Sequence, residues 1–247
     1  MCENKDYSEL LARYDAALEG IRKSEEECGR SGVRLLVAAK YATSDELDAL
    51  CLHRGLSAIG ENRTDTLIEH YEGMKNKVEI HFIGHLQRNK VKGIIDKVSL
   101  IHSLESIPLA EELQKQAEKR GLTVRVLAEV NIGREESKSG VLPEELREFC
   151  LEISKYPNIK LCGFMTMAPK STSFAEYYDY FKETYNLSID IWKNTLHNIQ
   201  EPIISMGMSD SYRAAIAAGA TVVRLGSSVF GRTTEDVMKM KNNKNNI

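Results

Sequence analysis

The chain has 247 residues, 42% of them hydrophobic and 28% charged, with a formal net charge of -3 at pH 7. A chain of this length can bury one large core, and without a broad basic surface it lacks the electrostatic signature of a nucleic-acid-binding protein. The five cysteines are scattered and show no C-x-x-C spacing, which argues against a disulfide framework or a zinc site and favours a reducing cytoplasm. No apolar run approaches the roughly 18 to 20 residues of a membrane span, so we expect a soluble cytoplasmic protein without nucleic-acid or membrane partners.

The first predicted element is an amphipathic helix within residues 1–30. Apolar side chains recur there at spacings of three and four, which is typical of a helix with one buried face. The stripe consists of Tyr7, Leu10, Leu11, Tyr14, Ala17, Leu18 and Ile21. We expect this extra N-terminal helix to pack on one end of the fold that the rest of the chain forms.

Eight short apolar runs follow, and they alternate with amphipathic stretches. The predicted strands cover residues 35–39, 58–60, 80–84, 100–102, 124–130, 161–164, 203–205 and 222–225. Helix starts are indicated between them at Ser44, Ser106, Pro143 and Ser209. Such alternation predicts a parallel sheet, and eight units favour a single closed (β/α)8 TIM barrel of the α/β class over residues 1–247. Only the Asn- and Lys-rich end, residues 239–247, is expected to remain unpacked.

Lys40 follows the first predicted strand on the same face as Leu36 and Ala38. If this face points into the barrel, the small Ala38 leaves room beneath a lysine at the carboxyl rim, where such barrels carry their ligand-binding residues. We interpret Lys40 as a candidate for Schiff-base formation with a carbonyl compound, which burial of the amine would assist. A rim lysine that only extends into water is the alternative.

Two loops rich in glycine and serine follow the seventh and eighth predicted strands, where many barrels bind phosphate. Their residues are Ser205, Gly207 and Ser209 in the first loop and Gly226, Ser227 and Ser228 in the second. Hydroxyls donate hydrogen bonds, and glycine permits a close approach of the backbone. Ordinary turns that cap helices explain either loop alone, but the two loops together favour phosphate. With Lys40 they would hold an aldehyde that carries a phosphate, for which pyridoxal 5'-phosphate is the obvious candidate.

Arg224 has the inward parity of Val222 on the last predicted strand and is expected to point at the same site. A guanidinium only donates hydrogen bonds, so against a pyridine nitrogen it would keep that nitrogen unprotonated. The ring would then be a weak electron sink, whereas a carboxylate partner would favour carbanion chemistry. An inward ion pair between Arg224 and an acidic residue is the alternative.

Six ordered segments resemble the pyridoxal phosphate homeostasis proteins, which are similar to the barrel domain of alanine racemase without its second domain. The segments are AAK at 38–40, IGEN at 59–62, HFIGHLQRNK at 81–90, GFMTM at 163–167, SMGMS at 205–209 and RLGS at 224–227. The resemblance covers nearly the whole chain. It implies an alanine racemase N-terminal-domain-like barrel that binds pyridoxal 5'-phosphate (PLP).

The same resemblance implies roles for individual residues. Lys40 would hold PLP as an internal aldimine, and Arg224 would face its pyridine nitrogen. The residues implied at the phosphate are Ser205, Gly226 and Ser227, and Asn62 would lie near the cofactor.

The function that the resemblance implies is intracellular PLP homeostasis without established catalytic turnover. The protein would bind PLP reversibly and buffer it or deliver it to PLP-dependent apo-enzymes, and a monomer is expected. An amino-acid racemase is one alternative, but it needs proton donors and acceptors on both faces of the substrate imine. In the alanine racemase-like enzymes one of these is a tyrosine from a second domain, for which this chain is too short. A Schiff-base aldolase is disfavoured by Lys40 on the first strand and Arg224 on the eighth.

His81 and His85 have the four-residue spacing of metal ligands on a helix. Gly84 and the apolar pair before it instead predict a strand that runs into a loop, where this spacing has no such meaning. We therefore expect no metal site. The motif at residues 81–90 stays without an assigned role.

Overall fold

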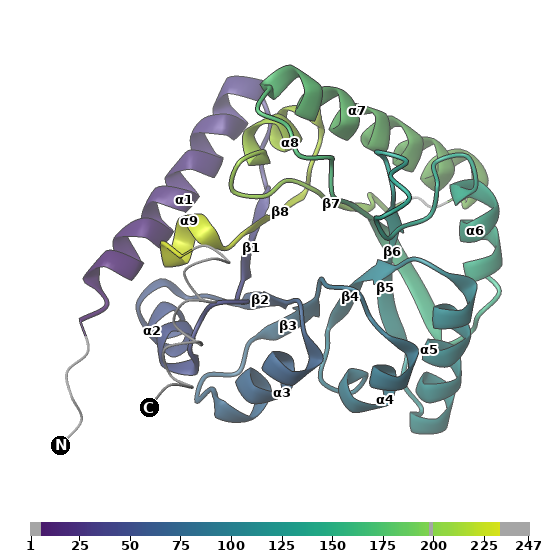
Figure 1. Ribbon diagram of the computed structural model, residues 1–247, viewed down its shortest axis with the longest axis horizontal. Helices are drawn as coiled ribbons and strands as arrows, with labels where there is room; N and C mark the ends of the chain where they lie inside the picture. The colour runs from purple at the N-terminus through teal and green to yellow at the C-terminus, as the bar shows by residue number, and fades with distance from the viewer. Residues whose placement is uncertain (1–5, 198–199, 233–247) are drawn as a thin grey trace.

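The computed structural model describes residues 6–197 and 200–232 of the chain. In this part eight parallel strands follow one another around a closed barrel, with helices on its outer side (Figure 1). The strands are β1 (Arg34–Ala38), β2 (Ala58–Glu61), β3 (Glu79–Phe82), β4 (Leu100–Leu104), β5 (Val124–Val130), β6 (Ile159–Thr166), β7 (Ile203–Ser205) and β8 (Val222–Leu225). The predicted TIM barrel is confirmed, and each predicted strand overlaps an observed one.

The helices connect successive strands on the outside of the barrel. They are α1 (Ser8–Cys28), α2 (Ser44–Arg54), α3 (Thr64–Gly73), α4 (Val91–Ile94), α5 (Ile107–Arg120), α6 (Leu146–Ile153), α7 (Phe174–Asp190), α8 (Tyr212–Ala218) and α9 (Ser227–Phe230), with a 3-10 turn η1 (Arg88–Lys90) and a π-helical turn η2 (Ile191–Thr195). Within the described ranges none of these helices combines the length and the apolar character needed to cross a membrane. The predicted tail at residues 239–247 lies outside the described residues.

Local sequence signals explain where several helices begin and end. The hydroxyl of Thr43 accepts a hydrogen bond from the Glu46 amide while the Glu46 side chain reaches back to the Thr43 amide, so α2 starts with a capping box. Gly55 ends the same helix in the left-handed conformation that glycine adopts without strain. The start signal Ser209-Asp210-Ser211 is confirmed at its last residue, because Ser211 is the N-cap of α8, after a turn in which the Met208 amide donates to the Ser211 hydroxyl.

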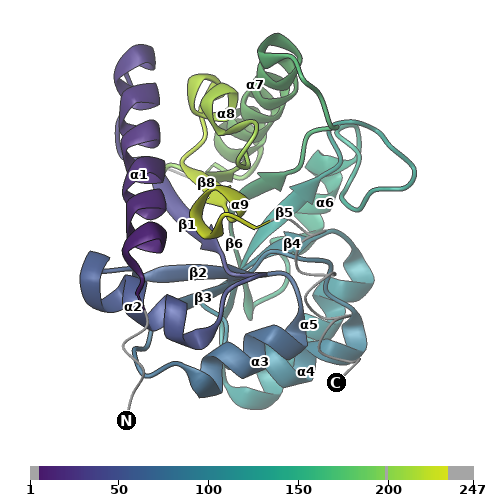
Figure 2. The same ribbon diagram turned by 60° about the vertical axis from the view of Figure 1, so that its left-hand side comes forward.

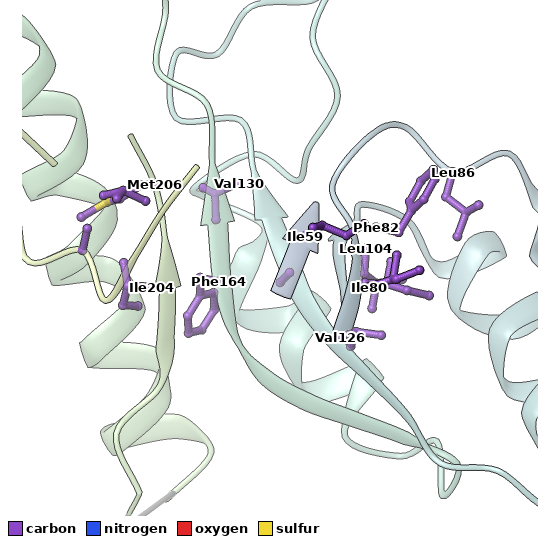
Figure 3. Packing of buried hydrophobic residues seen from close by; sticks show 14 of the residues in the cluster. Ile59, Ile80, Phe82, Leu86, Leu104, Val126, Val130, Phe164, Ile204 and Met206 are labelled. Carbon is purple, nitrogen blue, oxygen red and sulfur yellow. The ribbon is translucent and has the colours of Figure 1, made fainter. Parts of the chain in front are cut away.

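Strand parity divides the side chains between two cores. Alternate residues such as Val37, Ile59 and Phe82 point outward and pack beneath the helices in the main hydrophobic core (Figure 3). Leu36 and Val222 point inward, where they pack against Ala58 and Ile83. The inward parity expected for Leu36 is therefore confirmed.

α1 runs along the outer side of the barrel, next to α8 and α9 (Figures 1 and 2). The expectation that this helix packs on a barrel end is wrong. Among the described residues β8 is followed only by α9, which has four residues and is too short to cover the β1–β8 seam. α1 covers this seam instead, and its own side chains Tyr14, Ala17 and Ile21 are buried.

The close contact between β6 and β7 can be tested by substitution of Gly163 on β6. Its φ is +145°, and a Cβ at this position would lie 2.0 Å from the carbonyl oxygen of Ile203 on the neighbouring β7. We expect Gly163→Ala to lower the free energy of unfolding by about 2–4 kcal/mol, because the two strands must separate to admit a methyl group. Urea unfolding monitored by circular dichroism measures the change.

Gly93→Ala in α4 is the matched control, since no atom lies within 4 Å of the Cβ it would add. It should be neutral or stabilising by a few tenths up to about 1 kcal/mol. Equal effects of the two substitutions would contradict the close contact between β6 and β7.

Candidate functional site

A cavity of about 320 Å³ opens at the carboxyl ends of the strands, beside β1 and β8. This volume lies within the range of small-molecule pockets, and the carboxyl rim is where barrels of this kind bind their ligands. Its walls bring together five of the six predicted site residues, Lys40, Asn62, Arg224, Gly226 and Ser227. Residues separated by most of the chain therefore meet at one site.

Ser209 and Ser227 line one side of this cavity, and Ser228 adjoins them. The Ser227 hydroxyl donates to the Ser209 Oγ across 3.0 Å, and the Oγ atoms of Ser209 and Ser228 lie 3.2 Å apart. The Ser228 amide also donates to the Ser209 Oγ. Gly226 passes close to β1, because a Cβ there would lie 2.9 Å from the Ala38 carbonyl oxygen. Hydroxyl donors gathered beside a close backbone contact suit an anion such as a phosphate.

Lys40 comes directly after β1 and lines the same cavity. It is exposed, so burial does not assist imine formation at this amine. The Nζ atom lies 4.8 Å from the centroid of the Tyr41 ring, a distance at which a cation is attracted to the aromatic face. The amine is therefore accessible from the cavity mouth while the next side chain supports it.

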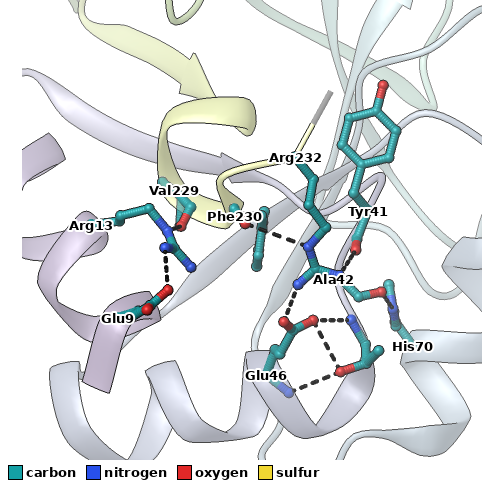
Figure 4. A network of polar contacts seen from close by, with 10 residues as sticks. Glu9, Arg13, Tyr41, Ala42, Glu46, His70, Val229, Phe230 and Arg232 are labelled. Atoms are coloured by element: carbon teal, nitrogen blue, oxygen red, sulfur yellow. Dashed lines mark hydrogen bonds and ion pairs between the residues drawn. The ribbon is translucent and has the colours of Figure 1, made fainter. Parts of the chain in front are cut away.

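The loop that carries Lys40 is fastened from the side of α9. The Arg232 Nη1 donates to the Tyr41 carbonyl oxygen at 3.1 Å, and the same guanidinium pairs with Glu46 on α2 (Figure 4). Arg232 comes directly after the end of α9, so the segment that follows the serine loop also restrains the lysine loop. This contact had no signal in the sequence, because an exposed arginine near a chain end is ordinarily a surface residue.

A buried ion pair fastens the lysine loop from the other side. The His70 Nδ1 lies 2.6 Å from the Glu61 Oε1, and its Nε2 lies 3.3 Å from the Ala42 carbonyl oxygen. The other oxygen of Glu61 accepts from the Thr66 hydroxyl. Burial acts to lower the pKa of His70, but the hydrogen bond and charge of Glu61 and the Ala42 carbonyl outweigh it and raise that pKa. Both ring nitrogens donate when the imidazole is charged, which matches these two acceptors.

Arg224 lines the cavity, and Ser205 lies beneath it. Arg224 is 5% exposed and donates from Nη1 to the Ser205 Oγ at 2.8 Å and from Nη2 to the Thr166 carbonyl oxygen at 3.0 Å. Burial lowers the pKa of Arg224 to about 10, against the opposing charge of Glu129, so the guanidinium stays charged at neutral pH. The ion pair weighed for Arg224 is not formed among the described residues, where its guanidinium donates to Ser205 and Thr166 and Glu129 acts on it through its charge alone.

The position of Ser205 differs from the one expected at the phosphate. Its side chain is 0% exposed, and its hydroxyl contacts Arg224 and the Nδ1 of His102. The physical reason is strand parity, because Ser205 is the last residue of β7 and points into the barrel before the loop begins. Ser209, further along the same loop, is the residue that faces the serines of the second loop.

Glu129 on β5 is a buried carboxyl group beside this site. It is 3% exposed and lines a second cavity of about 320 Å³, which shares Met167, Met208, Asp210 and Arg224 with the first. Burial, with a smaller contribution from the charge of Glu105, raises the pKa of Glu129 to about 7, and Arg224 opposes this shift. The carboxyl group is therefore partly protonated at neutral pH.

The two histidines with metal-like spacing lie apart. His81 points into the barrel, where its Nδ1 is 3.0 Å from the Nε2 of His102, whereas His85 is exposed and pairs with Glu105 at 2.8 Å. Within residues 6–197 and 200–232 no group of three or more His, Cys, Asp or Glu side chains is arranged to hold a metal ion. Gly84 of the same motif has a backbone role, since a Cβ there would lie 2.1 Å from the Asn62 carbonyl oxygen. The motif thus positions the backbone of a residue that lines the cavity.

Glu129 generates a prediction about the pH dependence of stability. Its pKa is about 7 in the folded protein against 4.5 ordinarily, so between these values the folded state binds more protons than the unfolded chain. Stability contributed by the protonated carboxyl group is present below the lower value and is lost as the pH rises through the higher one. The free energy of unfolding of Glu129→Gln should therefore rise relative to that of the wild type by about 1–3 kcal/mol as the pH increases from about 5 to about 8. Urea unfolding at a series of pH values measures this difference.

Glu118→Gln, at an exposed position on α5, is the control and should change the pH profile little. A Glu129→Gln profile parallel to that of the wild type would contradict a protonated Glu129.

Comparisons with known proteins agree with this geometry. Residues 22–234 match the family described as alanine racemase, N-terminal domain. The chain is 39% identical over 221 residues to a pyridoxal phosphate homeostasis protein of Aquifex aeolicus, covering 89% of this chain and 96% of that one. It is 33% identical over 201 residues to a pyridoxal phosphate homeostasis protein of Synechocystis, covering 81% and 91% of the two chains. The chain belongs to the family of pyridoxal phosphate homeostasis proteins.

Solved structures share the same barrel. A protein of unknown identity from Bifidobacterium adolescentis superposes with a TM-score of 0.84 at 30% identity, covering 93% of this chain and 98% of that one. PipY of Synechococcus elongatus, solved with PLP bound, has a TM-score of 0.77 at 24% identity and covers 90% and 100% of the two chains. An alanine racemase of Clostridium difficile has a TM-score of 0.68 at 18% identity, and the match covers 57% of that longer chain. The last two comparisons establish the fold alone.

Proposed function

We propose that this protein binds PLP covalently and reversibly and serves PLP homeostasis. The observation that carries the proposal is that Lys40 lines the same rim cavity as Ser209 and Ser227, which with the adjoining Ser228 form a three-serine cradle. An aldehyde with a phosphate needs these two groups at the two ends of one pocket. The names of the relatives and the PLP-bound neighbour PipY support the same ligand.

Each predicted site residue receives a role in this proposal. Lys40 supplies the amine that attacks the aldehyde carbon, with release of one water molecule. The serine cradle and the backbone at Gly226 hold the phosphate. Asn62 lines the wall, and Ser205 acts behind Arg224 instead of at the phosphate, as its burial requires.

Arg224 explains why binding is proposed instead of turnover. Two of its N–H groups are used by Ser205 and Thr166, and a guanidinium has further donors that can face the cavity it lines. PLP is a stronger electron sink for amino-acid chemistry when its ring nitrogen is protonated, and a partner that cannot accept a proton opposes that state. The site therefore suits storage of the cofactor better than carbanion formation. Delivery to PLP-dependent apo-enzymes, a monomeric state, a cytoplasmic location and one domain over residues 1–247 complete the proposal.

Replacing Lys40 tests covalent binding. The wild type with added PLP should show an absorbance band at about 420 nm that borohydride bleaches, because reduction converts the C=N bond to a stable amine. Lys40→Ala should lose the band and the reducible attachment while keeping its far-ultraviolet circular dichroism. Peptide mapping by mass spectrometry after reduction identifies the modified lysine.

Lys119→Ala is the control for Lys40→Ala, since Lys119 lies in the last turn of α5, which leads back to the opposite end of the barrel. It should keep both the band and the attachment. A wild type that gains no band, or an attachment that survives in Lys40→Ala, would refute the proposal.

The serine cradle is tested by comparing two ligands. Ser209→Ala should weaken PLP binding about 10- to 100-fold, because a hydrogen bond to a charged phosphate is lost. Binding of pyridoxal, which has no phosphate, should change less than about twofold by the same reasoning. Fluorescence titration measures both affinities.

Ser154→Ala, at the carboxyl end of α6, is the control and should leave both affinities unchanged. An equal loss for the two ligands in Ser209→Ala would place the phosphate elsewhere.

A further inference from the structure

A row of polar side chains, joined by three hydrogen bonds and one ion-pair contact, crosses the barrel interior beneath the proposed PLP site. It starts at Arg224, whose Nη1 contacts the Ser205 Oγ at 2.8 Å, and continues to the Nδ1 of His102 at 3.0 Å. The Nε2 of His102 is then 3.0 Å from the Nδ1 of His81. The row ends at Glu79, the first residue of β3, whose Oε2 lies 3.5 Å from the His81 Nε2. Four strands thus contribute to one polar path from the cavity floor to the opposite end of the barrel.

The chemistry of the two ends determines the direction of every hydrogen bond in this row. Arg224 can only donate, so the Ser205 oxygen accepts from it. The Ser205 hydrogen is then directed to its other partner, the His102 Nδ1, which must be unprotonated. His102 consequently carries its proton on Nε2 and donates to the His81 Nδ1. The proton of His81 is likewise on Nε2, directed at the carboxylate of Glu79.

Burial keeps both imidazoles neutral, as this direction requires. His102 is 0% exposed and His81 is 5% exposed. Burial lowers the pKa of His81 to about 4 and that of His102 well below its usual value, with the charge of Arg224 acting in the same sense on His102. Near His81 the charges of Arg34 and Arg125 also oppose protonation, while Glu79 favours it.

Packing alone does not account for these side chains. The neighbouring interior positions hold Leu100, Leu127 and Met165, so apolar residues fill the same layer of the barrel. A buried polar row is costly unless every member has a partner, and here each contact supplies the one that the next residue needs.

We propose that His102 and His81 are positioning residues for the cofactor site: as neutral Nε2–H tautomers they hold the Ser205 hydroxyl in the orientation that accepts from Arg224. This inference rests on the proposed function only for its effect on PLP. The tautomers themselves are a property of the unliganded protein. Neither histidine touches the cavity, so both act through Ser205 and Arg224.

The first experiment determines the imidazole tautomers of His81 and His102 in the protein without a ligand. Long-range ¹H–¹⁵N correlation spectra of the wild type at neutral pH should show His81 and His102 protonated on Nε2 alone. A proton on the Nδ1 of either ring, or a charged ring, would overturn the proposal. This result is independent of whether the protein binds PLP.

The second experiment reads the site with ¹⁵N-labelled PLP bound. His102→Leu removes the acceptor of the Ser205 hydroxyl, so we expect a shifted ring-nitrogen resonance and about tenfold weaker PLP binding. His102→Asn offers Oδ1 as an acceptor in place of Nδ1, so its ring-nitrogen resonance and its PLP affinity should be close to those of the wild type. Leu127→Ala is the control: it should lower the melting temperature but leave the resonance and the affinity unchanged.

The outcomes separate the two proposals. If the wild type binds no PLP, the proposed function fails, and the tautomer measurement still decides the arrangement of the row. If the wild type binds PLP, and His102→Leu has the same ring-nitrogen resonance and the same PLP affinity as the wild type, the positioning role of the histidines is refuted. Should His102→Leu fail to fold, His102→Asn and Ser205→Ala supply the comparison, since Ser205→Ala should reproduce the shifted resonance and His102→Asn should not.

Discussion

Closure of the barrel by pairing β1 with β8 is the constraint on which the site depends. In this register Leu36 lies beside Arg224, and Val37 lies beside Leu225. The strand that leads into Lys40 is therefore the neighbour of the strand that leads into Gly226 and its serines. The contact is tight, because a side chain at Gly226 would meet the carbonyl oxygen of Ala38. A parallel barrel places both strand ends on the same rim, so the Lys40 amine and the serines proposed to bind phosphate face one cavity.

The charges at this rim suit an anionic ligand. Arg224 is buried and donates to Ser205 and Thr166, and the pKa of Glu129, the carboxyl group whose charge acts on it, is raised to about 7. The histidines beneath are neutral. The positive charge of the guanidinium is therefore not cancelled within the barrel, and an anion entering from the rim meets it in a medium that screens poorly.

The alternation of apolar and amphipathic segments predicts the barrel, and strand parity and loop position predict Lys40, Arg224, Gly226 and Ser227 in the cavity wall, whereas Asn62 follows only from the resemblance. These features repeat locally, since the parity of Leu36 and Ala38 can be read from a few neighbouring residues. Ser205 was placed at the phosphate because serine at a strand end is ambiguous between the interior and the following loop. Its partner His102 is 103 residues away, and Arg232 meets Tyr41 across 191 residues. Pairings of this length depend on how the barrel closes, which no local pattern encodes.

The cover that α1 provides has a consequence for the order of folding. The helix formed by the first residues packs against α8 and α9, which are among the last described elements of the chain. The seam that it covers joins the first strand to the last. During synthesis the amphipathic face of α1 must therefore wait for almost the entire polypeptide before it can be buried. High sequence separation of this kind slows folding, and it makes completion of the PLP site one of the final events in the maturation of the protein.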